Sequence, residues 1–224
     1  PTIVPIAVKD RWIKSLAGTS LRGVKITFYA EGKKQFTIAG DILCAHFGLS
    51  GPLILNNAHR VADLLHGGAV TALIDLYPTM DLGALERRMI QVFDANKNKA
   101  LKNVVKDIVP EGAHKGVLLL IASEVDILTK VHSVTKDNRK YIVRLLKALP
   151  VTVEGLMGFD RAVVADGGVP LKEIDMKTMR SKKVENLYLA GDILDFDRPS
   201  GGFSLQICWT TGAVAGESAG SGLG

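Results

Sequence analysis

Four consecutive segments between Thr79 and Pro150 carry apolar residues at helical spacing, and this block constrains the fold more than any other feature of the sequence. Thr79 or Asp81 can cap the first segment, and Thr135 can cap the fourth, which ends at Pro150. Strand-like alternation precedes the block in "LRGVKITFYA" and returns after it in "VTVEGLMGF". The order predicts an α+β chain in which one β domain is interrupted by a small helical subdomain.

Composition limits the classes of partner. The chain has 224 residues, 47% of them hydrophobic, and a formal net charge of +5. Apart from "NKNKALKNVVK", the basic residues are scattered, so we expect no nucleic-acid partner. Cys44 and Cys208 are far apart and form no metal-ligand spacing, so we expect no metal site and interpret both as small buried hydrophobic residues. Apolar runs such as "VLLLIA" are too short to span a bilayer, so we expect no membrane partner and a cytoplasmic location.

The stretch "NLYLAGDILDFDRPSGGFSLQ" near the C-terminus has the pattern of a ligand site. Leu187–Ala190 is interpreted as a buried strand, with a tight turn at Gly191 and a carboxylate at Asp192. Gly201 and Gly202 would let a ligand approach the main chain at the start of a helix. The alternative is that this stretch binds no ligand and forms only a strand, a turn and a packed helix. That interpretation explains the same residues equally well.

Taken together, these residues resemble the C-terminal FAD-binding motif of the BaiN-type or HI0933-like NAD(P)/FAD-dependent oxidoreductases, L-Y-F/L-A-G-E-x-L-D followed by G-G-Y/F-N-L-Q. The chain departs from that pattern at Asp192, where Glu is usual, and at Ser204, where Asn is usual. The matching residues are Leu187, Tyr188, Ala190, Gly191, Leu194, Asp195, Gly201, Gly202, Phe203, Leu205, Gln206 and Gly212.

Two further blocks resemble the same family. "HFGLSGP" matches the family's H-x-G-L-S-G-P. The resemblance implies that His46 lies near the substrate side of the flavin, where it could act as a catalytic acid or base. The alternative is that His46 is a structural residue that forms a hydrogen bond within the turn. "ADGGVPLKEIDMKTMRSK" matches a third family block. The cofactor-binding residues that the resemblance implies are Gly167, Gly168, Val169, Gly191, Asp192, Gly201, Gly202, Phe203, Ser204, Leu205 and Gln206.

For the fold, the resemblance implies an inserted β-barrel-like domain interrupted by the helical subdomain, followed by the C-terminal part of a glutathione-reductase-like FAD-binding domain. The expected boundaries are 1–76 for the first part of the β domain, 77–150 for the helical subdomain, 151–165 for the closing strands and 166–224 for the C-terminal part. The G-x-G-x-x-G unit that receives a dinucleotide pyrophosphate does not occur in this sequence. We therefore expect a fragment whose partner is the missing N-terminal dinucleotide-binding segment.

The functional expectation follows from that resemblance. The intact protein would be an FAD-dependent oxidoreductase that transfers hydride between flavin and a small-molecule substrate or NAD(P)H. This chain by itself is expected to be inactive. The alternative is a non-catalytic binding or interaction module with a vestigial flavin motif.

Overall fold

The computed structural model describes residues 3–162, 167–196 and 199–221. The chain divides into two compact units. Val4–Arg161 form the first, called here the barrel unit. Pro1–Ile3 and Ala162–Gly224 form the second, called the C-terminal unit. Each unit is described by itself.

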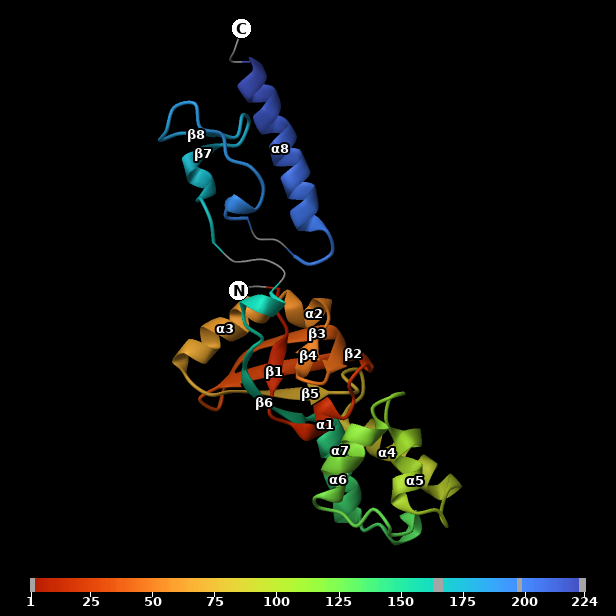
Figure 1. Ribbon diagram of the computed structural model, residues 1–224. Helices are drawn as coiled ribbons and strands as arrows, with labels where there is room; N and C mark the ends of the chain where they lie inside the picture. The colour runs from red at the N-terminus through yellow and green to blue at the C-terminus, as the bar shows by residue number, and fades with distance from the viewer. Residues whose placement is uncertain (1–2, 163–166, 197–198, 222–224) are drawn as a thin grey trace. The chain divides into compact units, whose positions relative to one another are not determined.

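The barrel unit is built on six antiparallel strands that close on themselves in the order β1-β4-β3-β2-β5-β6 (Figure 1). Along β2, Val24, Ile26 and Phe28 are fully buried while the residues between them are partly exposed, as the alternation in the sequence predicts. The strands are β1 Ile6–Val8, β2 Ser20–Ala30, β3 Lys33–Ala45, β4 Gly48–Ser50, β5 Val70–Asp75 and β6 Leu149–Leu156.

Two groups of helices cover this barrel. The short helices α1 Arg11–Lys14, α2 Pro52–Leu55 and α3 Ala58–Gly67 come from its connections. In Figure 1, α2 and α3 lie on the side of the barrel opposite to the helical subdomain. That subdomain comprises α4 Leu82–Ala95, α5 Leu101–Ile108, α6 His114–Ala122 and α7 Lys136–Lys147, with the short 3₁₀ turn η1 Val131–Ser133 before α7.

Local signals set the ends of these helices. The Asp81 carboxylate accepts a hydrogen bond from Ala84 N at 2.7 Å, and the Thr135 hydroxyl accepts one from Asn138 N at 3.2 Å. Each therefore satisfies a backbone donor of the first turn, which has no partner within the helix. Asp81 is the cap of α4, and Thr135 is confirmed as the cap of α7.

The helical subdomain and the barrel share one continuous hydrophobic core. One close approach is at Gly116 in α6, where a Cβ would lie 2.6 Å from the backbone oxygen of Trp12 in α1. The side chain of Trp12 in turn donates from Nε1 to Pro150 O at 2.8 Å, which ties α1 to the start of β6. The subdomain is thus packed directly on the barrel wall.

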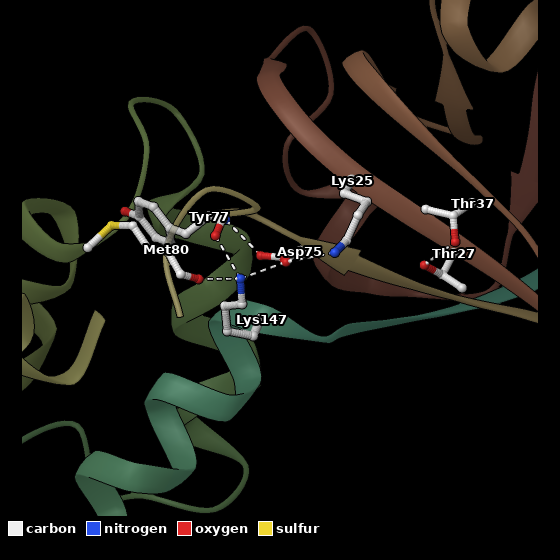
Figure 2. A network of polar contacts seen from close by, with 7 residues as sticks. All are labelled: Lys25, Thr27, Thr37, Asp75, Tyr77, Met80 and Lys147. Carbon is white, nitrogen blue, oxygen red and sulfur yellow. Dashed lines mark hydrogen bonds and ion pairs between the residues drawn. The ribbon is translucent and has the colours of Figure 1, made fainter. Parts of the chain in front are cut away.

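A buried polar network also joins the end of α7 to β5 (Figure 2). Lys147 Nζ lies 2.7 Å from Asp75 Oδ2 and donates to the backbone oxygens of Tyr77 and Met80, both at 2.7 Å. Asp75 Oδ1 accepts from Tyr77 N at 2.9 Å, and Lys25 Nζ lies farther away, at 3.6 Å from Asp75 Oδ2. One ammonium group therefore satisfies a buried carboxylate and two carbonyls at the junction of strand and subdomain.

Replacing Lys147 with Met should lower the free energy of unfolding by about 2–3 kcal/mol, because it leaves Asp75 and two carbonyls without their main donor. Lys25→Met is the matched control. Its side chain is more exposed and its ion pair longer, so the expected loss is below about 0.5 kcal/mol. Urea unfolding of both variants measures the difference, and equal losses would show that the Lys147 network does not hold the junction.

The C-terminal unit is smaller, with a core centred on Ile174, Met179 and Leu194. One expectation for this unit was wrong: Leu187–Ala190 is not a buried strand. Tyr188 forms a single antiparallel bridge with Arg180, and Leu187 is 39% exposed. A strand needs a longer paired edge; here the pairing shown is limited to the bonds around this bridge, from Ser181 N to Leu187 O and from Leu189 N to Met179 O. The elements are η3 Leu171–Glu173, β7 Ile174–Asp175, β8 Arg180–Ser181, η4 Gly191–Ile193 and α8 Phe203–Ser221; η2 Phe159–Arg161 precedes the unit.

The mixed α and β character expected from the sequence is confirmed, with a six-stranded sheet and a helical subdomain in one unit. None of the helices in the described ranges is long and apolar enough to cross a membrane.

Candidate functional site

The first part of the candidate site is the backbone around Gly168 and Val169. Val169 N donates to Ile193 O at 2.8 Å, and Asp195 N donates to Val169 O at 3.1 Å, forming a parallel bridge between Val169 and Leu194. Gly168 has φ +146°, and a Cβ there would lie 2.6 Å from Ile193 O. Only glycine lets the two segments approach this closely. Gly167, which precedes the bridge, is exposed.

The second part is the turn at Gly191, which is anchored to α8. Gly191 has φ +73°, and its N–H donates to the buried Thr211 hydroxyl at 2.8 Å. That hydroxyl donates in turn to Ile207 O at 2.6 Å. A Cβ on Gly191 would lie 3.2 Å from Cys208 Sγ. The turn therefore rests against one face of α8, and Asp192 follows it as an exposed residue of η4.

The third part is the loop that opens α8. Gly201 and Gly202 have φ +103° and +92°, and a Cβ on either would meet no atom within 4 Å. Gln206 N donates to Gly202 O at 3.1 Å, so helical bonding begins at Gly202. The backbone N–H groups of a first helical turn have no partner within the helix and give it a partial positive charge. The helix start at Phe203 is confirmed, and the loop before it is open to an electron-rich group.

The side chains of this first turn are mostly exposed. Phe203 is 55% and Leu205 58% exposed, while Ser204 is half-buried. The Gln206 side chain is exposed and donates to Thr210 Oγ1 at 3.1 Å. The described residues 201–206 thus present backbone, the apolar side chains of Phe203 and Leu205, and two uncharged polar side chains.

The rest of α8 is also unusually exposed for an apolar helix. Thr211 is the only described residue of α8 that is buried, and Trp209 is 66% exposed. A helix that is apolar all round normally lies in the core of a larger domain. The exposed apolar face therefore indicates a surface that another segment covers.

His46 lies in the barrel unit, at the turn between β3 and β4, whereas the other candidate residues lie in the C-terminal unit. Its side chain is exposed, and its ring meets that of Phe47 edge-on, with centroids 4.9 Å apart. The structure joins 168–169 to 193–195 and the Gly191 turn to α8 at Cys208 and Thr211, whereas the cofactor role of 201–206 and the catalytic role of His46 stay predictions.

The two cysteines differ. Cys44 is buried, and this burial raises the pKa of its thiol to about 12, so it stays protonated and unreactive at neutral pH. Its interpretation as a small buried hydrophobic residue is confirmed. Cys208 is half-buried and packs against the Gly191 turn. Sequence reasoning missed this contact and the anchoring role of Thr211, although both face the turn from α8, three residues apart.

Within the described ranges, no group of three or more His, Cys, Asp or Glu side chains could hold a metal ion. The geometry instead defines a class of protein: a closed barrel with a helical subdomain, followed by a unit in which glycine loops open onto the start of an apolar helix.

Residues 1–164 match the family described as "HI0933-like protein barrel and H2TH domain", and the chain belongs to this family. The resemblance seen in the sequence motifs is thereby confirmed.

Three relatives align with most of the chain. A 3-dehydro-bile acid delta(4,6)-reductase of Clostridium scindens is 26% identical over 98% of this chain and 53% of its own length. Two proteins named ribosomal RNA dihydrouridine synthase are also similar. The one from Haemophilus influenzae is 28% identical over 94% of this chain and 49% of its own length, and the one from Escherichia coli is 26% identical over 85% and 45%. The chain thus spans about half the length of the relatives that it matches.

Proposed function

We propose that this chain supplies the flavin-ring half of an FAD-dependent oxidoreductase. The observation that carries the proposal is the open Gly201–Gly202 loop at the start of α8, a helix that Thr211 holds against the Gly191 turn. Neither glycine would bring a side chain near another atom, so the backbone there is accessible to a planar ring.

The described residues fit such a group. FAD, when bound, would supply hydride transfer, which no side chain can perform. The first turn of α8 would place N–H donors and partial positive charge at the ring edge, favouring its electron-rich form. Phe203 and Leu205, both exposed, would cover the ring and exclude water. A glutathione-reductase-like domain and NAD(P)H as electron donor belong to the same proposal.

The exposed apolar surface of α8 supports a partner segment. We infer that the missing dinucleotide-binding segment, with the G-x-G-x-x-G unit, covers Leu205, Trp209 and their neighbours. Relatives about twice as long as this chain have room for such a segment.

The names of the relatives offer two classes of substrate. A small molecule is the first candidate, since one relative is a bile-acid reductase by name. An RNA base is the second, since two relatives are named as ribosomal RNA dihydrouridine synthases. A concentration of positive charge in the helical subdomain favours the second, and it revises the expectation that nucleic acid is not a partner.

The test is the visible absorbance spectrum of the complete product of the gene that contains this sequence. We expect flavin bands in that protein and little flavin in the 224-residue chain, because recognition of the pyrophosphate needs the missing unit. Gly202→Val in the complete protein should abolish flavin retention, since a β-branched side chain blocks the loop, whereas Gly220→Ala should retain it. A colourless wild-type protein would favour the non-catalytic binding module instead.

His46→Gln tests the catalytic prediction. A positioned acid or base contributes roughly 10²–10⁴-fold to a rate, so flavin reduction or reoxidation should slow at least ~10-fold with flavin content unchanged. Stopped-flow rates and melting temperature are measured on the same variant, with His66→Gln, another exposed histidine of the barrel unit, as control. A normal rate with a lowered melting temperature would make His46 a structural residue of the turn.

A further inference from the structure

The positive charge of the chain is concentrated in one part of the fold. Residues 81–147 contain thirteen lysines and arginines and eight acidic residues, which gives the same +5 as the whole chain. The rest of the sequence is balanced, with fifteen residues of each sign. Before the subdomain, residues 1–80 hold eight basic and five acidic residues (+3), and after it residues 148–224 hold seven and ten (−3), so the helical subdomain has the largest excess of cations by sequence.

Backbone pairing gathers several of these cations. The loop after α4 runs beside the segment that precedes α7, joined by an antiparallel bridge between Ala100 and Lys130. Val131 N donates to Lys99 O at 3.0 Å, and His132 N donates to Lys97 O at 3.3 Å. Lys97, Lys99, Lys130 and His132 are all exposed. Residues about half the length of the subdomain apart in sequence thus meet on one surface.

A hollow of about 390 Å³ adjoins this surface, lined by Lys97, His132 and Arg139 among others. Arg139 Nη1 donates to Val134 O at 3.1 Å. Its Nε is buried and has no hydrogen-bond partner, the one such side-chain atom found among the described residues. A buried donor without an acceptor is costly, and an anionic oxygen in the hollow would satisfy it.

The acidic residues near this surface do not cancel it. Asp94 also lines the hollow, but it pairs with Lys97 at 3.7 Å, and both side chains are more than half exposed, so the pair is weak. Asp126 is engaged locally, accepting hydrogen bonds from Leu128 N and the Thr129 hydroxyl. Asp137 lies in the first turn of α7, where it complements the helix.

We propose that Lys97, Lys99, Lys130, His132 and Arg139, called here the basic cluster, bind the phosphate backbone of a folded RNA. The cations extend along the paired segments beyond the hollow, which suits a polyanion better than a small anion. Phe93 also lines the hollow but is only 5% exposed, so it offers bases little stacking surface, and the contacts that we propose are to phosphates. The choice of RNA rests on the second substrate class proposed above, whereas binding itself requires no flavin.

The experiment uses the 224-residue chain and a fluorescein-labelled RNA hairpin, with fluorescence anisotropy measured across a salt series. The triple variant Lys97→Gln, Lys99→Gln, Lys130→Gln removes three cations of the basic cluster. Lys9→Gln, Lys33→Gln, Lys34→Gln is the matched control, because it removes three exposed charges from the barrel. The cluster variant should raise Kd at least ~10-fold and lower the slope of log K against log salt by about 2–3, while the control changes Kd less than about twofold.

Replacing the same three lysines with arginine should restore wild-type affinity, which separates loss of charge from damage to the fold. Three results would each overturn the proposal: no binding of RNA by the wild-type chain, equal losses in the cluster and control variants, or binding by the same lysines to vesicles with anionic lipid but not to RNA. A flavoprotein whose chain fails these RNA tests would leave the proposed oxidoreductase function intact.

Discussion

A Gly48→Ala variant is expected to lose at least ~3 kcal/mol of unfolding free energy, a large part of the stability of a domain of this size. Gly48 opens β4 and has φ +153°, where a side chain is strained. A Cβ there would lie 2.2 Å from the Ile6 backbone oxygen and 2.9 Å from Val8 N. Both atoms belong to β1, which pairs with β4 and with β6 to close the barrel.

The added methyl group cannot be accommodated by a side-chain movement, because the atoms it meets are backbone. β1 would have to shift away from β4, and its pairing with β6 would be strained at the same time. Gly155→Ala in β6 is the control, since its Cβ would meet no atom within 4 Å and its φ is not in the left-handed region. Thermal and urea unfolding of both variants measure the difference. Similar stabilities would show that the barrel closure is more plastic than its geometry indicates.

Gly48 shows that a family motif can also carry a residue needed by the fold. "HFGLSGP" resembles a family block that contains His46, a predicted catalytic residue. The structure gives Gly48 a role in closing the barrel and places Gly51, with φ +92°, close to Leu43 N. Both roles depend on strands distant in sequence, so spacing alone could not distinguish a structural glycine from a ligand-binding one.

Features set by neighbouring residues were predicted well. Thr135 caps α7 and α8 begins at Phe203, because a cap or a glycine pair acts within one helical turn. The buried strand predicted at Leu187–Ala190 was wrong, because a strand depends on the neighbouring edge that pairs with it. The basic cluster was only partly visible in the sequence, because "NKNKALKNVVK" contains Lys97 and Lys99 but not Lys130, His132 or Arg139. His132 Nδ1 lies 2.8 Å from Lys97 O across 35 residues, so cations that look scattered along the chain meet in the fold.

A Gly168→Ala variant should have the second large effect, on the C-terminal unit. Gly168 has φ +146°, and its Cβ would lie 2.6 Å from Ile193 O and 2.9 Å from Asp195 N. The segment that holds these atoms bonds to Val169, through Val169 N to Ile193 O at 2.8 Å and Asp195 N to Val169 O at 3.1 Å. The methyl group therefore cannot enter without breaking the bridge.

The unit has little capacity to absorb that change, because the buried core cluster among its described residues consists of Ile174, Met179 and Leu194, and Leu194 is itself in the bridge. We expect amide protection in residues 167–196 to fall by about a hundredfold, while the barrel unit keeps its melting temperature. Hydrogen exchange on the 224-residue chain measures both, with Gly220→Ala near the end of α8 as control, where a Cβ would meet no atom within 4 Å.

In the complete protein, Gly168→Ala should cut flavin content to less than about a tenth. The reason is that η4 connects the Gly191 turn directly to this bridge, so a displaced bridge displaces the turn. Wild-type protection in the Gly168 variant would mean that the bridge tolerates a shifted backbone, and flavin loss without loss of protection would place Gly168 against the cofactor itself.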